Sequence, residues 1–584
     1  MVNCYEETTV LEKVDSSLWD GDAVSTALKA KEWAESQRDV PYLTRAAYTS
    51  GLVAPGGSLV RWVGMVQDMG SPEFYRCKGD GGCRMYRDIL QPIEGATLEI
   101  DPETKQSIAE RQKLYCVPVP GLAAWARRHL MGDVSELQKS SSLGAAGSSK
   151  REREEEVLEA EEGHAFGGGS EEEESNSPVA SSTRQKRHDE PMMVDNESPS
   201  IYAPKVADVE CLVRWYPDTE TETMPAKLND IVEVIGVLGA EVGGGAIDSE
   251  DWDAAVSKVA RVHALSVKTL GHSFLPEVVN TEPERIATLK AFAIKDVIGP
   301  ALNNNFMAAE YVFLTLLSRP YMRVAPDRAL GGASLEIITQ TDCVKELYKA
   351  ISLIVPVASL IKTSKIEKPP KRDIIGLGAA DEKGYSQDFF GREERLVKDH
   401  PLQLSPGTVA LLDHDSFFWE TCKALVGESK FTMYDFAYEE FTRIDVDIPA
   451  IVVTNNRRGI EADASVVVDD FPQNLTDDHL KNLDPLLLQD LRSYVQKARA
   501  VDDIHFDGTV AKAVQDDYLS LRKSSTIPSN LAENTLHYFL TLVRLHAKSL
   551  LVDKNITIDH WRHCLALETN RLNQLKSMRR VAGF

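Results

Sequence analysis

The sequence lacks the patterns on which several protein classes depend. Its eight cysteines include no C-x-x-C pair and are too few among 584 residues for a disulfide scaffold, so zinc ribbons and thioredoxin-like sites lack their starting pattern. The most apolar stretch, 351–361, is far shorter than the ~20 residues that span a bilayer. The first residues carry no apolar segment of a secretory signal. We therefore expect a soluble intracellular protein with no membrane association and no metal site.

Recognisable catalytic patterns and positive charge are also missing. The thirteen histidines form no H-E-x-x-H motif, and no G-x-S-x-G motif places a serine on a sharp strand-to-helix turn. Acidic residues outnumber basic ones 90 to 65, which gives a formal charge of −25. That average field repels a polyanion, so we do not expect direct, sequence-independent nucleic-acid binding without a local basic patch.

An acidic insert divides the chain. Residues 136–200 are rich in serine, glycine and glutamate, and 151–200 hold 15 acidic and 5 basic residues. Apolar side chains are too sparse there to offset the entropy of ordering, so we expect this insert to be disordered. Within it, Arg184, Lys186 and Arg187 form a short basic cluster, which fits either a nuclear-import signal or a solvated charge run.

Short strands are predicted on both sides of the insert. The clearest are SLVRWVGMVQDM (58–69), KLYCVPVPG (113–121), CLVRWY (211–216) and DIVEVIGVLG (230–239). Five or so such strands predict an OB-like β-barrel built from 51–135 and 201–278, after a partly helical segment, 1–50. The insert 136–200 is then one long loop, which a barrel tolerates because closure entropy grows only logarithmically with loop length.

Barrels of this kind often bind single strands through aromatic and basic side chains. Such residues do interleave in the predicted strands. They are Trp62, Phe74, Tyr75, Tyr86, Tyr115, Trp215 and Tyr216, with Arg61, Arg76, Arg84, Arg87 and Arg214. Because strand residues alternate between core and surface, the rings either fill the barrel or form a stacking platform, and we favour core filling.

From about residue 279 the pattern becomes that of an α/β domain. Four apolar runs are typical of buried strands. They are SLEII (334–338), TVALL (408–412), AIVVT (450–454) and SVVV (465–468). Asp342 is placed to cap the helix after the first run.

We expect a nucleoside-triphosphatase-like core over 279–475 and a helical lid over 476–584. One stripe of the lid is Leu536, Leu540, Val543 and Ala547.

The phosphate-binding loop that such a core requires is missing. In G-x-x-x-x-G-K-[ST], glycine amides wrap the phosphates and the lysine neutralises them. Here the loop begins with Thr339, Gln340, Thr341 and Asp342, contains no glycine and is too short to wrap a phosphate. Asp342 would repel a phosphate, and Lys345 lies inside the next helix. The site is therefore predicted not to bind nucleotide, and we expect no nucleotide cofactor.

The ends of two other predicted strands carry polar residues. Asp413 stands where a magnesium-binding acid belongs, but His414 replaces the Glu that would activate water. The pair is either a relic of a metal site or an exposed acidic strand end. Asn455 occupies the place of a residue that faces a γ-phosphate, and it is equally an ordinary turn residue.

Five stretches of the sequence carry a family resemblance. They are VGMVQDMGSPEFY (63–75), YCVPVPG (115–121), KLNDIVEVIGVL (227–238), MAAEYVFLTLLS (307–318) and AVQDDYLSLRK (513–523). Through them the chain resembles the MCM-binding protein family. Its members are nuclear partners of the minichromosome maintenance helicase and in plants are linked to sister-chromatid cohesion. The resemblance spans most of the chain outside roughly 1–50 and the acidic insert.

The resemblance implies a degenerate AAA+-like α/β domain with a helical lid, related to the helicase subunits themselves. GTVALLDHD (407–415) resembles the helicase strand that ends in Asp-Glu, and His537 stands where the helicase pattern has an arginine. The stretch that bears the helicase arginine finger has no counterpart here. Resemblance and residue chemistry therefore both imply a protein that is not an enzyme and needs no cofactor.

The resemblance further implies a nuclear regulator of DNA replication. Such a protein binds minichromosome maintenance helicase subunits, controls their assembly, stability or unloading, and associates with chromatin through that partner. Two other functions stay open from the residues alone. One is a single-stranded nucleic-acid-binding protein that uses the barrel, and the other is an active ATPase with an unorthodox loop.

Overall fold

The structure of the chain is a computed structural model. It describes most of residues 23–83, 108–131, 209–239, 260–271, 282–374, 395–502 and 504–581, with short gaps inside several of these ranges. The acidic insert and its basic cluster, Arg184, Lys186 and Arg187, lie outside the described residues. Among the helices in the described ranges, none combines the length and the apolar character needed to cross a membrane.

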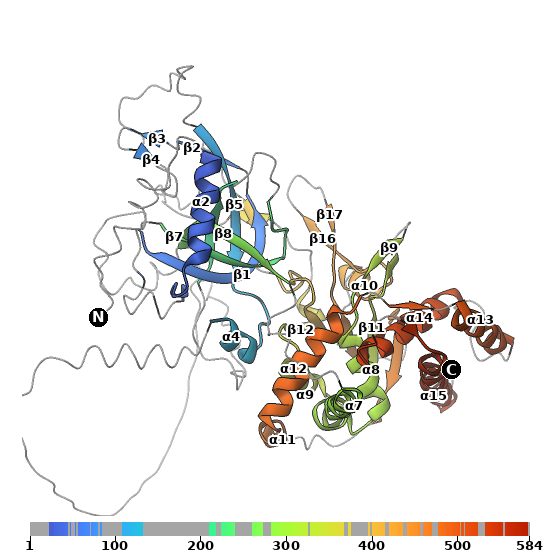
Figure 1. The fold of residues 1–584 in the computed structure, drawn as a ribbon. Helices are drawn as coiled ribbons and strands as arrows, with labels where there is room; N and C mark the ends of the chain where they lie inside the picture. Colours follow the sequence, from blue (N-terminus) through green and yellow to red (C-terminus); the bar gives the residue numbers. More distant parts are fainter. Residues whose placement is uncertain are drawn as a thin grey trace, which may run out of the picture. The chain divides into compact units, whose positions relative to one another are not determined.

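Five strands on the two sides of the insert close into a ring (Figure 1). They are β1 (Leu59–Met69), β5 (Ile108–Val117), β6 (Cys211–Trp215), β7 (Ile231–Leu238) and β8 (Ala260–Leu270). The order is β1-β7-β8-β6-β5, and β5 pairs back to β1. β6 and β8 run parallel, whereas the other neighbours are antiparallel. A bulge between Val66 and Asp68 bends β1, which helps it to pair on both sides.

A helix packs against the outside of this ring. It is α2 (Ala23–Ser36), and its residues Ala27, Ala30 and Ala34 are buried at helical spacing. They share a hydrophobic cluster with Ile235 of β7 and Leu265 of β8. Because alanine side chains are short, the helix backbone lies close to the wall of the barrel (Figure 1).

A five-stranded parallel sheet forms the centre of the second part of the chain. Its strands are β11 (Ser334–Ile338), β12 (Ala358–Lys362), β15 (Val409–His414), β18 (Ala450–Thr454) and β19 (Ala464–Val467). They pair in the order β12-β15-β18-β11-β19. β11, β15, β18 and β19 are the four apolar runs of the sequence. The fifth strand, β12 (ASLIK), is not among the predicted strands.

Helices cover both faces of the parallel sheet. Val409 and Leu411 of β15 belong to a cluster with α8 (Phe306–Leu316) and α9 (Val344–Ile354). Ala410 and Leu412 point to the other face and belong to a cluster with α10 (Glu420–Val426). Because both faces of β15 are buried, its residues from Val409 to Leu412 are continuously apolar rather than alternating.

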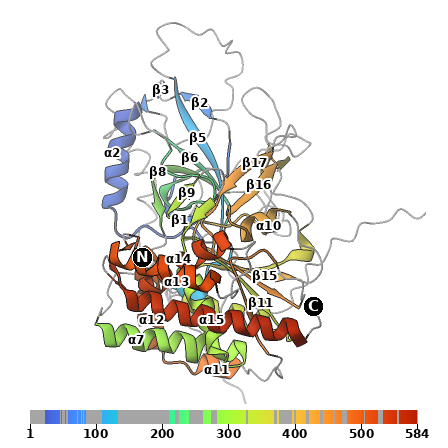
Figure 2. The same cartoon turned by 90° about the vertical axis from the view of Figure 1, so that its right-hand side faces the viewer.

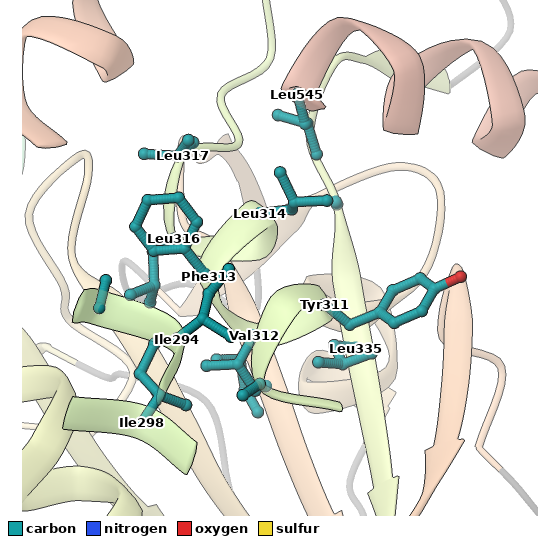
Figure 3. Close-up of a cluster of buried hydrophobic side chains, with 14 of the residues drawn as sticks. Ile294, Ile298, Tyr311, Val312, Phe313, Leu314, Leu316, Leu317, Leu335 and Leu545 are labelled. Carbon is teal, nitrogen blue, oxygen red and sulfur yellow. The ribbon is translucent and has the colours of Figure 1, made fainter. Parts of the chain in front are cut away.

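The helix α8 is buried almost all round. Asn305 caps it by accepting a hydrogen bond from the Ala308 amide at 3.0 Å. Every side chain from Tyr311 to Leu316 is buried. The surrounding cluster includes Leu335 of β11 and Leu545 of the lid (Figure 3). A helix that is apolar on all sides belongs in the interior of a large domain.

Four C-terminal helices share this same core. They are α12 (Pro485–Ala500), α13 (Gly508–Lys523), α14 (Ala532–Ser549) and α15 (Ile558–Val581), and the short helix α11 (Asp477–Lys481) precedes them. α12 lies beside α7 (Pro283–Phe292), as Figure 2 shows, and α15 contacts β19. One hydrophobic cluster includes Leu289, Tyr494, Val543 and Trp561. The lid and the sheet therefore form one continuous core.

A buried ion pair joins α15 to the sheet. Arg571 Nη2 lies 2.7 Å from Glu568 Oε2, and their side chains are only 8% and 1% exposed. Arg571 also donates to the Ser465 carbonyl of β19 at 3.1 Å, and the Tyr311 hydroxyl donates to Glu568. Removing either charge would leave the other buried without its partner, which typically costs about 3–5 kcal/mol.

Shorter elements complete the described fold. Before residue 280 they are β2 (Glu73–Arg76), β3 (Lys78–Gly79), β4 (Gly82–Cys83) and α4 (Ala124–Met131). After it they are η4 (Ala293–Ile298), η5 (Gly299–Leu302), β9 (Met322–Val324), β10 (Arg328–Leu330), η6 (Thr363–Lys365), β13 (Arg372–Ile374), β14 (Arg395–Val397), β16 (Phe431–Asp435), β17 (Phe441–Asp445), β20 (His505–Phe506) and β21 (Asn555–Ile556).

Candidate functional site

The carboxyl ends of β11, β15 and β18 meet at one edge of the parallel sheet. Thr454, the last residue of β18, is in register with Ile338 of β11 and with His414 of β15. The loop that starts at Thr339 therefore lies at the same edge as Asp413 and Asn455. In open parallel sheets this edge is the usual place for a ligand, so it is the first candidate for a functional site.

The loop after β11 uses its own amides to attach itself to the sheet. The Thr339 amide donates to the Thr454 carbonyl at 3.0 Å, and the Thr341 amide donates to Thr339 Oγ1 at 3.2 Å. Gln340 Nε2 donates to the Asn455 carbonyl at 3.2 Å. A phosphate-binding loop instead leaves its amides free for the ligand. In this loop two of those donors already have acceptors within the protein.

The start of α9 differs from the sequence prediction. Cys343, not Asp342, is the N-cap residue, and its side chain makes no capping hydrogen bond, so the predicted Asp342 cap is wrong. The helix begins at Val344, one residue later than an Asp342 cap requires. Both Asp342 and Lys345 are exposed. The Lys345 side chain therefore projects into solvent from the first turn of α9.

The charges at this edge of the parallel sheet disfavour the binding of an anion. Burial, together with the nearby charges of Asp342, Glu346 and Asp413, raises the pKa of the Cys343 thiol to about 12. A helix N-terminus ordinarily favours negative ligands through its dipole. Here three carboxylates already act on that position, so a triphosphate would meet repulsion where a nucleotide-binding protein provides attraction.

The remaining residues of the predicted nucleotide site lie on the strand ends or on α14. Asp413 and His414 are half-buried at the end of β15, and the Asp413 carbonyl accepts a hydrogen bond from Thr363 Oγ1 at 3.2 Å. Asn455 is exposed directly after β18. His537 is half-buried on α14, and within the described residues no hydrogen bond or ring contact joins it to the sheet edge. The structure thus gathers the strand-end residues Asp413, His414 and Asn455 at one edge of the sheet.

A second polar cluster lies between four helices and was not identified in the sequence. Lys290 Nζ of α7 lies 2.9 Å from Glu310 Oε1 of α8 and 3.3 Å from His546 Nδ1 of α14. His563 Nε2 of α15 lies 3.3 Å from the same Glu310 oxygen, and its ring stacks on that of His546 with centroids 4.2 Å apart. These four residues share no sequence motif, so no local pattern could have indicated their meeting.

Members of this second cluster shift the pKa values of Glu310 and His546. Burial opposes ionisation of Glu310, but hydrogen bonds from His563 and Lys290 and their positive charge lower its pKa to about 2. Burial, followed by the charges of Lys290 and His563, lowers the pKa of His546 to about 3. At neutral pH the cluster therefore holds an ionised Glu310 carboxylate and a neutral, buried His546 imidazole.

The aromatic side chains that the structure describes in and beside the barrel strands are buried. Trp62, Tyr115, Trp215 and Tyr216 are all buried. The Tyr216 hydroxyl, for example, accepts from Arg111 Nη1 at 2.9 Å and hydrogen-bonds His263 Nδ1 at 2.7 Å. Phe74, Tyr75, Tyr86, Arg76, Arg84 and Arg87 have side chains outside the described residues. Trp62 and Trp215 belong to the cluster inside the barrel, whereas Tyr216 lies in the cluster under α2 and Tyr115 in a third cluster with Met65 and Leu212. Core filling is therefore confirmed for two of the four described rings, and the other two are buried elsewhere.

Fold and site together define a class of protein. The described residues contain a closed ring of five strands and a parallel sheet with helices on both faces, and the loop after β11 uses its Thr339 and Thr341 amides in hydrogen bonds within the protein. The sequence profile of the family described as "Mini-chromosome maintenance replisome factor" matches residues 28–417 and 420–575. The chain belongs to this family.

Curated relatives align over nearly the full length of the chain. A protein of Gallus gallus is 25% identical over 630 residues, which cover 95% of this chain and 93% of the relative. One of Arabidopsis thaliana is 25% identical over 554 residues, covering 89% and 88%, and one of Drosophila melanogaster is 23% identical over 589 residues, covering 89% and 90%. All three are named Mini-chromosome maintenance complex-binding protein.

Proposed function

We propose that this chain is a non-enzymatic regulator of DNA replication that binds minichromosome maintenance helicase subunits. It controls their assembly, stability or unloading from chromatin and contributes to sister-chromatid cohesion. The observation that carries the proposal is the family match over 28–417 and 420–575, together with full-length relatives named for binding this complex. The chain reaches chromatin through this partner.

The strand order of the ring and the strand order of the parallel sheet support the fold that we propose for each part of the chain. The ring order β1-β7-β8-β6-β5, with its parallel pair β6 and β8, is compatible with an OB-like barrel split by the acidic insert. In chain order, the strands of the parallel sheet are arranged 2-3-4-1-5, which places the first strand in the interior with its following loop at the sheet edge. We infer a degenerate AAA+-like domain from this arrangement and from the resemblance in sequence.

The absence of catalysis is inferred from the sheet edge. The 339–343 loop has no glycine, ties its Thr339 and Thr341 amides to the protein, and stands beside the carboxylates of Asp342 and Asp413. A protein that mimics a helicase subunit but cannot hydrolyse nucleotide could occupy an ATPase-domain face of a true subunit. Because hydrolysis would not release it, such a mimic would compete with ring closure.

We place this activity in the nucleus, where the helicase acts. The basic cluster of Arg184, Lys186 and Arg187 is the candidate import signal. Changing all three to Ala in a tagged full-length chain is expected to shift it to the cytosol, as seen by fluorescence microscopy. An unchanged nuclear signal would assign import to another segment or to the partner.

A single-stranded nucleic-acid-binding barrel is the alternative function. Its support is weakened by the buried rings of Trp62, Tyr115 and Trp215 and by the pairing of Arg61 with Glu233 at 2.8 Å. Titration of the full chain with a labelled oligonucleotide across a range of salt distinguishes the two functions. Micromolar binding with a steep salt dependence would favour the alternative.

The test of the main proposal is direct capture of helicase subunits. Tagged full-length chain is mixed with each purified subunit, with and without Mg-ATP, and complexes are resolved by size-exclusion chromatography. We expect a stable complex with at least one subunit, and the same complex with the variant Asp413→Ala. Failure to bind any subunit, alone or in assembled complexes, would overturn the proposal.

A further inference from the structure

We propose that Glu310, His546 and His563 form a binding site for a divalent transition metal of the zinc type, with Lys290 as an internal competitor. The site lies where α8, α14 and α15 meet. The inference is independent of the proposed helicase-binding function, because it rests only on the side chains gathered between these helices.

The ligand atoms are already close to one another. One donor atom from each of Glu310, His546 and His563 lies within 4.8 Å of the others. In a tetrahedral zinc site with bonds of about 2.0–2.1 Å, neighbouring ligand atoms are about 3.3–3.4 Å apart. The 3.3 Å between His563 Nε2 and Glu310 Oε1 matches that edge. Binding therefore requires mainly that the His546 ring turn out of its parallel stack with His563.

The Lys290 ammonium group shows that these donors already hold a cation. Its Nζ lies 2.9 Å from Glu310 Oε1 and 3.3 Å from His546 Nδ1, two of the three proposed ligands. An ammonium ion and a metal ion use the same lone pairs, so only one of them can occupy the position at a time. A divalent ion must displace Lys290, and its affinity includes the cost of that displacement.

The structure provides space for the displaced lysine. A groove of about 790 Å³ adjoins the cluster and is lined by Lys290 and Glu310 themselves, together with Phe306, Leu550 and Leu567. A lysine stem can lie along such apolar surface while its charged end stays in water. His563, which is 46% exposed, gives an ion access to the site from solvent.

The donor set selects the type of metal. Two imidazoles and one carboxylate suit zinc and its transition-metal neighbours, whereas calcium and magnesium prefer sets made of oxygen alone. Three protein ligands leave a fourth position for water. The consequence we assign to the site is structural. A bound ion would connect α14 and α15 to α8, which lies in the centre of the core.

The experiment uses the full-length protein after removal of metal with a chelator. Zn²⁺ binding is measured by calorimetry, and Co²⁺ is added separately because its visible absorption bands report tetrahedral coordination. We expect one Zn²⁺ site that is weakened about tenfold or more in His563→Ala and in Glu310→Gln. We expect tighter binding in Lys290→Met, since the competing ammonium group is gone. His505→Ala removes an exposed histidine elsewhere and should bind as the unchanged protein does.

A stability measurement accompanies the titration. Saturating Zn²⁺ should raise the melting temperature of the unchanged protein and more strongly that of Lys290→Met, but not that of His563→Ala. Because His563 is partly exposed, its loss should leave the fold intact even if Lys290→Met folds poorly. Equal Zn²⁺ affinity and stoichiometry in the unchanged protein, His563→Ala and Glu310→Gln would overturn the proposal and make the cluster a purely structural ion-pair network.

Discussion

Glu336 is a carboxylate buried in the middle of the parallel sheet. It is the central residue of β11 and is fully buried, yet both of its oxygens have partners. The Ile460 amide donates to Oε1 at 2.8 Å and the Ser465 hydroxyl to Oε2 at 2.6 Å. Burial raises its pKa above the ordinary value of 4.5, and these two hydrogen bonds offset part of the rise.

This raised pKa makes stability depend on pH. The folded state holds the Glu336 proton more tightly than the unfolded state, so the free energy of unfolding falls as pH rises from 4.5 through the folded pKa. Glu336→Gln is neutral throughout and loses this dependence. We expect the urea midpoint of the unchanged protein, measured relative to Glu336→Gln, to be lower at about pH 7 than at about pH 4.

Ser465→Ala provides the matched control for that measurement. It removes the hydroxyl that stabilises the ionised carboxylate, so the pKa of Glu336 should rise further and the pH dependence should become larger. A difference between the unchanged protein and Glu336→Gln that does not vary with pH would show that Glu336 titrates alike in both states.

At the scale of the element, α14 shows how tertiary packing shifts a helical face. The predicted stripe of Leu536, Leu540, Val543 and Ala547 is only partly buried. Val543 and Ala547 are buried, but Leu536 and Leu540 lie at the edge of the core. The other buried apolar side chains of α14 are Tyr538, Phe539, Leu542 and Leu545, and the polar residues His546, Lys548 and Ser549 are also buried. The apolar face is therefore broader than the stripe and turned away from Leu540.

Two substitutions on α14 test this orientation. Val543→Asp places a carboxylate in the core without a partner and should lower the unfolding free energy by about 3–5 kcal/mol. Leu540→Asp lies at the edge, where water can reach the charge, and should cost about 1–2 kcal/mol. Urea unfolding followed by circular dichroism measures both. Equal losses would mean that Leu540 is as buried as Val543.

At the scale of the whole molecule, we predict from the sheet edge that Mg-ATP does not change the stability of the protein. A ligand that binds only the folded state stabilises it by RT ln(1 + [L]/Kd), about 2.7 kcal/mol at a hundredfold excess over Kd. A functional site of micromolar affinity would therefore raise the melting temperature by a few degrees in millimolar Mg-ATP. We expect no shift, because the 339–343 loop offers no phosphate cradle.

The variant Asp413→Ala is the control for this prediction. It removes the candidate magnesium-binding carboxylate, so it should melt identically with and without Mg-ATP. An ATP-dependent stabilisation of the unchanged chain that disappears in Asp413→Ala would contradict the non-enzymatic proposal and reopen the ATPase alternative.

Much of the α/β domain could be predicted from the sequence because its signals are local. β15 and β18 contribute residues to the hydrophobic clusters on both faces of the sheet and therefore carry continuous apolar runs, and β11 and β19 contribute apolar residues to one of these clusters. The missing phosphate loop is equally local, since the absence of glycine over 339–343 is visible in five letters. The strand β12 was not predicted and the cap of α9 was assigned to Asp342 instead of Cys343, because neighbouring strands and capping geometry decide them.

The sequence by itself determined four of the five strands of the parallel sheet and the loss of the phosphate-binding pattern, because each depends on residues close together in the chain, and its composition determined the acidic balance. Only the tertiary structure decided that β5 pairs back to β1 and that β6 runs parallel to β8. It alone brought Lys290 to His546 across 256 positions and Glu310 to His563 across 253. The physical reason is that such contacts depend on how helices pack around a shared core, and no local pattern records that packing.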